Sequence, residues 1–295
     1  MNLFRIIVAT VGSIVALVVL VVLAAFTGLP EVVDLMHHTP RHTALMRARA
    51  QEALRDGRRF AIDERWVPYE RISPTLRRAV LIAEDDAFFS HDGLDWNEIR
   101  ASAQVNLERG RIVRGGSTIT QQLARNLYLG EERTLLRKLR EMLLARRLES
   151  ALTKRRIFEL YLNLIEWGDG VFGAEAAARR HFGTTAADVT PRQAALLAAV
   201  IINPRLYSAE HPAPRIERRM RMILGRMRRR GFISEDEYLV AIGREAPHHF
   251  FNPFEWLFGG SHGHEHESSQ AMPDTGSPSV PPDTSGVAPA DSLPG

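Results

Sequence analysis

Residues 73–93 read SPTLRRAVLIAEDDAFFSHDG, and this segment indicates the fold class of the chain. Ser73 followed by Pro74 is typical of a helix start, because a serine hydroxyl accepts from free backbone N–H groups and proline fits the first turn. The apolar run 79–83 leads directly into three acidic residues, followed by a histidine and a glycine. The segment therefore predicts a buried helix that ends in a cluster of charged groups.

Three further segments have a helix-start pattern in which Ser or Thr is followed three residues later by Gln or Glu. They are Thr118 with Gln121, Thr190 with Gln193, and Ser234 with Glu237. Apolar residues recur at helical spacing over 135–148 and 194–201. Strand-like stretches are few and short, and the best candidate is 59–67. We therefore expect a mainly α-helical fold from about residue 73 onward.

An uncharged and strongly apolar segment covers residues 6–29. As a helix it would be about 36 Å long, which exceeds the ~30 Å hydrocarbon layer of a membrane. A cleaved signal peptide usually has an apolar region of only about 7–15 residues that ends in a small-x-small site. We therefore expect an uncleaved anchor over residues 1–30, with a cleaved signal or a buried soluble helix as alternatives. Arg5 before the segment, and Glu31 and Asp34 after it, favour a cytoplasmic N-terminus.

Charge is unevenly distributed along the 295 residues. The whole chain carries +3, but segment 259–295 has five acidic residues and no Lys or Arg, which leaves +8 on the remainder. A basic domain fits an anionic partner such as nucleic acid, a phospholipid surface or a phosphorylated substrate. Segment 259–295 is rich in Pro, Ser and His, so we expect a disordered tail there. The chain has no cysteine, which excludes disulfides, thiol nucleophiles and Cys-ligated metal sites.

The first segment whose residues could take part in catalysis runs from Glu84 to Gly93. An acid at the end of an apolar helix is partly desolvated, which raises its pKa towards the range of a general base. The second, 114–123, reads RGGSTITQQL. Its glycines allow a ligand to approach closely, and the helix start presents N–H groups to an anion, although the Walker lysine is missing. A solvated helix end and a flexible turn are the respective alternatives.

The third segment, 137–141, reads RKLRE. Arg137 and Glu141 are i, i+4 neighbours on a helix, so a surface salt bridge is the simple interpretation. The chain nevertheless has only two lysines, Lys138 and Lys154, and both lie in these helical segments. A compact ammonium group could be needed at both places, although chance would also explain two lysines.

In this order the motifs resemble those of the biosynthetic peptidoglycan glycosyltransferases, or transglycosylases. This family also occurs as the glycosyltransferase domain of bifunctional penicillin-binding proteins. The motifs are Glu84-Asp85-x-x-Phe88-x-x-His91-x-Gly93, Gly115-Gly116-Ser117-Thr118-Ile119-Thr120-Gln121-Gln122-Leu123, Arg137-Lys138-x-x-Glu141, Lys154-x-x-Ile157-x-Glu159-x-Tyr161-Leu162-Asn163 and Trp167-Gly168-Asp169-Gly170-Val171-Phe172-Gly173. The likeness covers roughly residues 65–230, and too little chain follows for a transpeptidase, so the monofunctional type is implied.

The resemblance implies a lysozyme-like, mainly helical glycosyltransferase domain with an N-terminal transmembrane helix. We accordingly expect an anchor over 1–30, a periplasmic or extracytoplasmic catalytic domain over 31–258, and the tail over 259–295. The implied location is the cytoplasmic (inner) membrane, crossed once. The implied activity is polymerisation of lipid II into glycan strands during cell wall synthesis, by inverting transfer with undecaprenyl diphosphate as the leaving group.

By matching position, Glu84 would be the catalytic base and Glu141 the second catalytic acid. Residues implied to bind the donor diphosphate are Thr118, Gln121, Gln122, Arg125, Arg137 and Lys138. Residues implied to be structural parts of the motifs are Asp85, Phe88, His91, Gly115, Gly116, Ser117, Lys154 and Asn163. Arg125 departs from the family pattern, which usually has lysine there, and arginine keeps both the charge and the ability to bind phosphate.

No cofactor is implied as essential and no metal site is expected, although Mg²⁺ or Mn²⁺ could accompany the diphosphate with help from Asp85. The expected partners are lipid II, the growing undecaprenyl-linked glycan, the membrane and cell-wall synthesis or division proteins. Nucleic acid is not expected, because the basic run 218–230 alternates with Met and Ile instead of base-stacking aromatics. That run would form a solvated helix face or contact lipid head groups. A lytic peptidoglycan-cleaving enzyme and a non-catalytic membrane-tethered scaffold are the alternative functions.

Overall fold

The computed structural model describes residues 2–111, 115–130, 132 and 134–245. The chain separates into two units, Met1–Pro247 and His248–Gly295, and only the first contains described residues. Our expectations for the tail at 259–295 and for residues 246–258 therefore lie outside the described residues.

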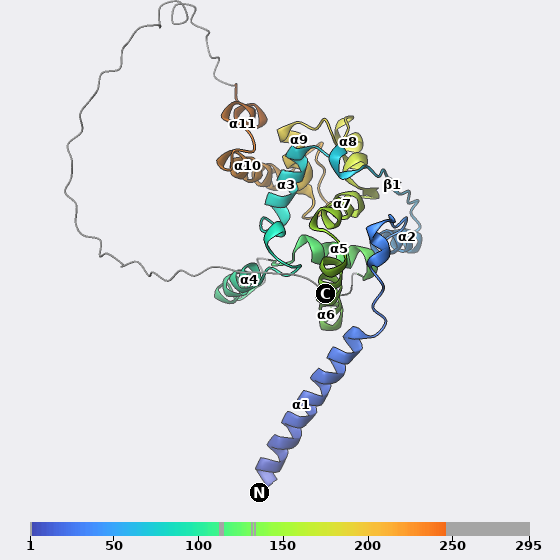
Figure 1. The fold of residues 1–295 in the computed structure, drawn as a ribbon. Coiled ribbons are helices and arrows are strands. Elements are labelled where there is room, and N and C mark those ends of the chain that lie inside the picture. The colour runs from blue at the N-terminus through green and yellow to red at the C-terminus, as the bar shows by residue number, and fades with distance from the viewer. Residues whose placement is uncertain (1, 112–114, 131, 133, 246–295) are drawn as a thin grey trace, which may run out of the picture. The chain divides into compact units, whose positions relative to one another are not determined.

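Helices dominate the described part of the chain (Figure 1). The α-helices are α1 (Asn2–Phe26), α2 (Ala44–Arg55), α3 (Pro74–Glu84), α4 (Trp96–Glu108), α5 (Ile119–Tyr128), α6 (Leu135–Ala151), α7 (Lys154–Leu164), α8 (Ala174–Phe182), α9 (Pro191–Val200), α10 (Pro214–Arg229) and α11 (Glu235–Ala241). The strands are β1 (Asp63–Glu64), β2 (Glu166–Gly168) and β3 (Val171–Phe172). The predicted mainly α-helical fold is confirmed.

Helix starts agree closely with the sequence. The side chains of Ser73, Thr118, Thr190 and Ser234 each accept a backbone N–H at the start of α3, α5, α9 and α11. The last three also form the reciprocal capping box with Gln or Glu. These caps are confirmed because each depends on chemistry within one helical turn.

The core is organised around α9, which is buried from Ala194 to Val200 and packs against α3 and α10. A second group is centred on α5, which contacts α2, α6 and α7. Figure 1 shows α3, α9, α10 and α11 in the upper part of the view and α5 and α6 below them. The functional site lies where residues from the two groups meet.

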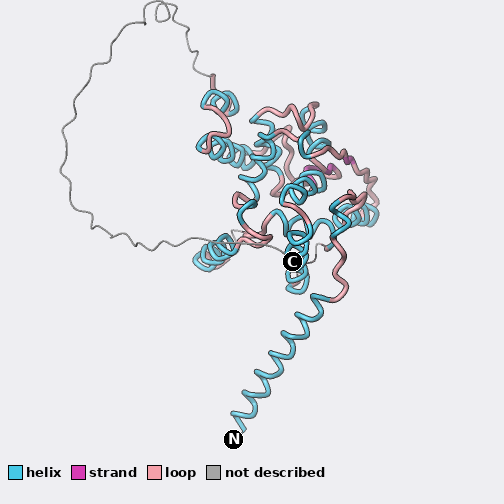
Figure 2. Tube along the Cα trace, in the orientation of Figure 1, coloured by secondary structure: helices cyan, strands magenta, loops and turns pink. Residues whose placement is uncertain are grey.

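A three-stranded sheet is the one β element among the described residues (Figure 2). Strand β3 pairs in parallel with β1 and antiparallel with β2. Only Asp63 and Glu64 of the expected 59–67 stretch form a strand. The strand is short because its partner β3 is itself only two residues long.

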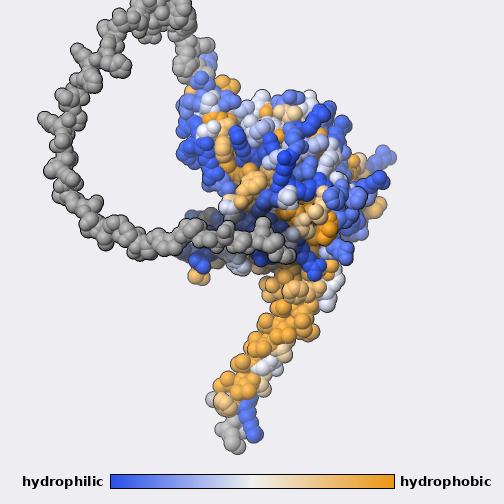
Figure 3. All heavy atoms as spheres, viewed as in Figure 1, coloured by the Kyte–Doolittle hydropathy of each residue, from blue (hydrophilic) through white to orange (hydrophobic). Residues whose placement is uncertain are grey.

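Apolar side chains cover most of α1, with hydrophilic atoms near its N-terminal end (Figure 3). Its segment Phe4–Phe26 is long and apolar enough to cross a membrane. None of its most hydrophobic stretch is buried inside the protein. The helix ends at Phe26, three residues before the predicted end at Leu29. Gly28 explains this difference, because its φ of +65° is the left-handed conformation that ends a helix, and Pro30 further disfavours a helical Leu29.

Candidate active site

Glu84 is the last residue of α3, and its side chain is 12% exposed. Its Oε1 accepts from Nη2 of Arg219 at 2.8 Å, and its Oε2 accepts from Nε2 of Gln122 at 3.1 Å. Burial raises the pKa of the Glu84 carboxyl, and the contacts with Arg219, Gln122 and nearby Arg125 offset this only in part. The result is a mostly buried carboxylate with a raised pKa, which suits a general base.

The residues after Glu84 connect the end of α3 to the start of α5. Oδ2 of Asp85 accepts from the Ile119 N–H at 2.9 Å, and Nε2 of His91 lies 3.1 Å from Oδ1 of Asp85. Nδ1 of His91 accepts from the Gly93 N–H at 3.2 Å. Both oxygens of Asp85 are thus used within the protein. Through these two contacts His91 links Asp85 to Gly93 across the loop.

A divalent cation finds no ready ligand set in the described part of the chain. No group of three or more His, Asp or Glu residues there has metal-binding geometry. Asp85, which we had considered for this role, is occupied by the contacts described above. Among the described residues, no cluster of three such side chains is therefore available as a ready-made ligand set.

The loop before α5 lies close to α4. A Cβ atom added at Gly116 would lie 3.3 Å from Cα of Ile99, so only glycine fits without displacing the neighbouring helix. The Thr118 hydroxyl donates to the Gly93 carbonyl at 2.7 Å, and the Gln121 side chain accepts from the Thr118 N–H at 3.0 Å. Both of these side chains are buried, and their hydrogen bonds fix the loop.

Glu84 lines a cavity of about 870 Å³. The cavity is bounded by the end of α3, the 115–118 loop, α4 and α10. Its lining residues include Glu84, Asp85, Asp86, Asp95, Glu98, Gly115, Gly116, Ser117, Thr118, Ile202, Arg219, Met222, Arg226, Arg229 and Arg230. We call this space the glutamate cavity.

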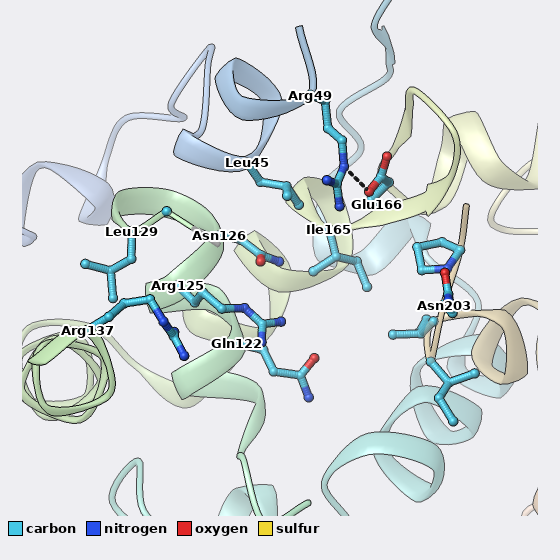
Figure 4. A pocket seen from close by; sticks show the side chains of 14 residues that line it. Leu45, Arg49, Gln122, Arg125, Asn126, Leu129, Arg137, Ile165, Glu166 and Asn203 are labelled. Atoms are coloured by element: carbon cyan, nitrogen blue, oxygen red, sulfur yellow. Dashed lines mark hydrogen bonds and ion pairs between the residues drawn. The ribbon is translucent and has the colours of Figure 1, made fainter. Parts of the chain in front are cut away.

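A second cavity, of about 530 Å³, lies beside it and is shown in Figure 4. Gln122 and Arg125 of α5 and Arg137 of α6 line one side, and α2 and the 201–204 segment line the other. The two cavities adjoin, because Ile202 lines both, and Gln122 of the second cavity binds Glu84 of the first. We call this space the arginine cavity.

Glu141 binds two of the predicted donor-binding cations, Arg137 and Lys138. Its side chain is 2% exposed and accepts from Nη1 of Arg137 at 2.6 Å and from Nζ of Lys138. Nζ of Lys138 also donates to Oγ of Ser117 at 3.0 Å. Arg137 lines the arginine cavity and Ser117 lines the glutamate cavity. The pair of Arg137 with Glu141 therefore forms inside the site, which contradicts the simple interpretation of a surface salt bridge.

The remaining motif residues lie behind the site. Phe88 is fully buried, and Nζ of Lys154 lies 4.4 Å from the centre of its ring. Lys154 also donates to Glu149 at 2.8 Å. The Asn163 side chain accepts from the Val67 N–H and donates to the Val67 carbonyl, both at 3.0 Å. Gly115 lines the glutamate cavity at the open side of its loop.

Two residues of the hydrogen-bond network around Glu84 were missed by sequence reasoning. Arg219 was expected on a solvated or lipid-facing surface, but it binds the carboxylate from α10. Its spacing from buried Ile216 and Ile223 places it beside the apolar face of the helix, and this signal could have identified it. Tyr161, whose hydroxyl donates to Gln122 at 3.0 Å, was noted only as part of a motif.

A buried ion pair at the far side of the arginine cavity was also missed. Nε of Arg49 in α2 donates to Oε2 of Glu166 at 2.9 Å. Burial raises the pKa of Glu166, and Arg49 opposes this shift. The charges of this pair cancel, so the net positive charge of the cavity comes from the opposite wall.

A mainly helical domain with a buried carboxylate at one cavity and several cations at the adjoining one defines an enzyme suited to group transfer from an anionic leaving group. Comparison with known proteins identifies the protein family. The transglycosylase family model matches residues 51–228, and the chain belongs to this family. The expected lysozyme-like, mainly helical domain is thereby confirmed.

Similar proteins carry one consistent description. The biosynthetic peptidoglycan transglycosylase of Methylobacillus flagellatus is 48% identical over 217 residues, which covers 74% of this chain and 94% of the relative. Those of Nitrosospira multiformis and Chromobacterium violaceum are 45% and 47% identical. The matches cover 67% and 64% of this chain and 86% and 83% of the respective relatives.

Proposed function

We propose that this protein is a membrane-anchored, monofunctional peptidoglycan glycosyltransferase that polymerises lipid II into glycan strands. The observation that carries the proposal is the hydrogen bond of Glu84 to Gln122, which joins a buried carboxylate to a cavity containing Arg125 and Arg137. The description of the relatives as biosynthetic peptidoglycan transglycosylases supports the substrate class.

In this mechanism Glu84 acts as the base. Its carboxylate takes the proton from the 4-hydroxyl of the acceptor sugar, and the freed oxygen forms a bond to the anomeric carbon of the donor. The bond from that carbon to the diphosphate oxygen breaks with inversion. The raised pKa of Glu84 supports this role, because a base is most effective when its pKa approaches the working pH.

The departing undecaprenyl diphosphate would be stabilised in the arginine cavity. Arg125 and Arg137 line this cavity, and Lys138 is joined to Arg137 through their shared partner Glu141. These three cations and one carboxylate keep a net positive charge for a diphosphate. Glu141 is the second acid of the proposal. It would hold Arg137 and Lys138 in place and would not exchange protons with the sugar.

We assign α1 as the membrane anchor, with the N-terminus in the cytoplasm and the catalytic domain on the periplasmic side. The length and exposure of Phe4–Phe26 support an anchor, and the charges that flank it support the orientation. An enzyme that uses a lipid-linked donor must work at the membrane surface. Proteins of cell-wall synthesis or division are the partner class that follows from this activity.

Incubation with labelled lipid II and, separately, with finished peptidoglycan tests the proposed function. The full chain, reconstituted in lipid vesicles, should convert lipid II into long glycan strands and leave finished peptidoglycan intact. Release of soluble fragments from finished peptidoglycan would instead indicate a lytic enzyme. Absence of turnover with both substrates would indicate a scaffold.

A further inference from the structure

A chain of two hydrogen bonds leads from the core of the domain to Glu84. The hydroxyl of Tyr161 in α7 donates to Oε1 of Gln122 at 3.0 Å, and Nε2 of Gln122 donates to Oε2 of Glu84 at 3.1 Å. Tyr161 is 0% exposed. Burial and the nearby Glu84 carboxylate raise the pKa of the Tyr161 hydroxyl well above its ordinary value. Tyr161 therefore keeps its proton and remains a donor.

This contact favours one orientation of the Gln122 amide, and the ionised Glu84 carboxylate, which can only accept, favours the same one. An amide has one acceptor end and one donor end. With the hydroxyl of Tyr161 bound to the oxygen, the NH₂ group must face Glu84. The reversed orientation would place the amide oxygen against a carboxylate oxygen and would remove a hydrogen bond that stabilises the ionised base.

We propose that Tyr161 is a positioning residue that orients the Gln122 amide and, through it, keeps Glu84 in the ionised form that accepts the proton. This inference rests on the proposed function, in which Glu84 is the base. Tyr161 lies behind Gln122 and touches no reacting atom.

Other charged groups also lie near the Glu84 carboxylate. Replacing Tyr161 by Phe removes one hydroxyl and changes none of these charges. Arg219 approaches from α10 and Arg125 from α5, and Asp85 follows directly on the chain. The only charged residue of α9, Arg192, is paired with Glu217 at 2.6 Å. Further charged residues in the glutamate cavity are Asp86, Asp95, Glu98, Arg226, Arg229 and Arg230.

The variant Tyr161→Phe tests the proposal through the pH dependence of kcat/KM for lipid II polymerisation. Loss of the orienting donor weakens the hydrogen bond to the ionised base, so the acid limb should move to higher pH by about half a unit to one unit. Activity should fall about 3- to 10-fold below the limb and return to within about 2-fold of the wild type on the plateau. Tyr69→Phe is the matched control, because that ring also packs against Phe158 but lies outside this hydrogen-bond chain.

A second variant keeps the test decisive if Tyr161→Phe folds poorly. In a Gln122→Met background the acid limb should already be shifted, and adding Tyr161→Phe should move it no further. An equal loss at every pH, an unshifted limb in folded Tyr161→Phe, or a further shift in the Gln122→Met background would overturn the proposal. Failure of the wild type to polymerise lipid II would instead refute the proposed function itself.

Discussion

Glu84 lies between two opposing influences. Burial raises the pKa of its carboxyl, and the guanidinium of Arg219 stabilises the ionised form from 2.8 Å away. Because the effect of burial is the larger of the two, the carboxyl ends with a raised pKa while it still has two hydrogen-bond donors. A carboxylate with these properties is a stronger base than an ordinary glutamate.

The pH dependence of catalysis should reflect this arrangement. Only the ionised carboxylate is a base, so activity should fall as the pH decreases through the raised pKa of Glu84, and the acid limb should lie above the ordinary value of 4.5. Replacement of Arg219 by Gln removes the largest stabilising charge, so the limb should move up by about one unit or more. Arg219→Lys, which keeps the charge, is the control and should shift the limb less. A limb that stays fixed in Arg219→Gln would contradict the assignment of Glu84 as the titrating base.

Single residues differ in how far sequence could predict them. Glu84 and Glu141 stand in motifs, and the structure brings both to adjoining cavities through Gln122 and Arg137. The contact of Arg219 was not predictable from its arginine-rich surroundings alone. Its spacing from Ile216 and Ile223 indicates that it lies beside the apolar face of α10, but that spacing does not identify its partner Glu84, which lies 135 residues earlier in the chain.

Among the elements, α8 shows how backbone conformation fixes a turn beside the site. Gly173 at its start has φ +87°, and Gly183 at its end has φ +65°. A Cβ atom at Gly173 would lie 2.7 Å from the carbonyl oxygen of Asn163, whereas one at Gly183 would meet nothing within 4 Å. Both positions favour glycine, but only the first is also sterically closed.

Alanine substitutions at the two glycines should therefore differ in cost. Gly183→Ala carries only the left-handed backbone penalty and should lower the free energy of unfolding by about 1 kcal/mol. Gly173→Ala adds a clash with backbone and should cost at least about 2 kcal/mol more. Urea unfolding of the two variants measures the difference. Equal destabilisation would show that the 163–173 contact is looser than the structure indicates.

Helix caps were predictable because each involves residues within one turn, as for Thr190 and Gln193. The strands were not, because β1 exists only through pairing with β3, more than one hundred residues away. Hydropathy located α1, but not its exact end at Phe26. Local chemistry was thus predicted well and long-range pairing poorly.

At the scale of the molecule, arginines of α6 and α7 bind the C-terminal end of α1 and the segment that follows it. Nη2 of Arg140 in α6 donates to the carbonyls of Ala24 and Thr27, each at 3.1 Å. Arg156 in α7 donates to the carbonyl of Leu35 at 2.9 Å. A cation at the C-terminal end of a helix also stabilises the helix dipole. These contacts connect α1 to the domain through more than the peptide chain.

Loss of Arg140 should loosen this connection. Because the chain has no cysteine, spin labels can be placed on cysteines introduced at Val15 and Ser150, and the distance between them measured by pulsed electron resonance. Arg140→Ala should broaden the distance distribution. Arg179→Ala, in which the lost guanidinium contact is with Glu175 of the same helix, should leave it unchanged. An unchanged distribution in Arg140→Ala would show that the arginine does not restrain the anchor.

Neither the contact of α1 with α6 nor the adjoining of the two cavities could be inferred from the sequence. Each depends on segments far apart along the chain, as with Ala24 and Arg140, and hydrophobic periodicity indicates which face is buried but not what covers it. The motifs were informative because they resemble those of a known family.

We claim that Glu84 activates the acceptor while the cations of the arginine cavity bind the donor. Single-turnover kinetics of Glu84→Gln with vesicle-borne lipid II, together with its equilibrium binding of that substrate, separates these two roles. Glutamine keeps the shape and removes the base, so binding should stay within about 3-fold of the wild type while the rate of chain extension falls at least ~100-fold. Chain extension at the wild-type rate, or a loss explained entirely by weaker binding, would contradict the claim.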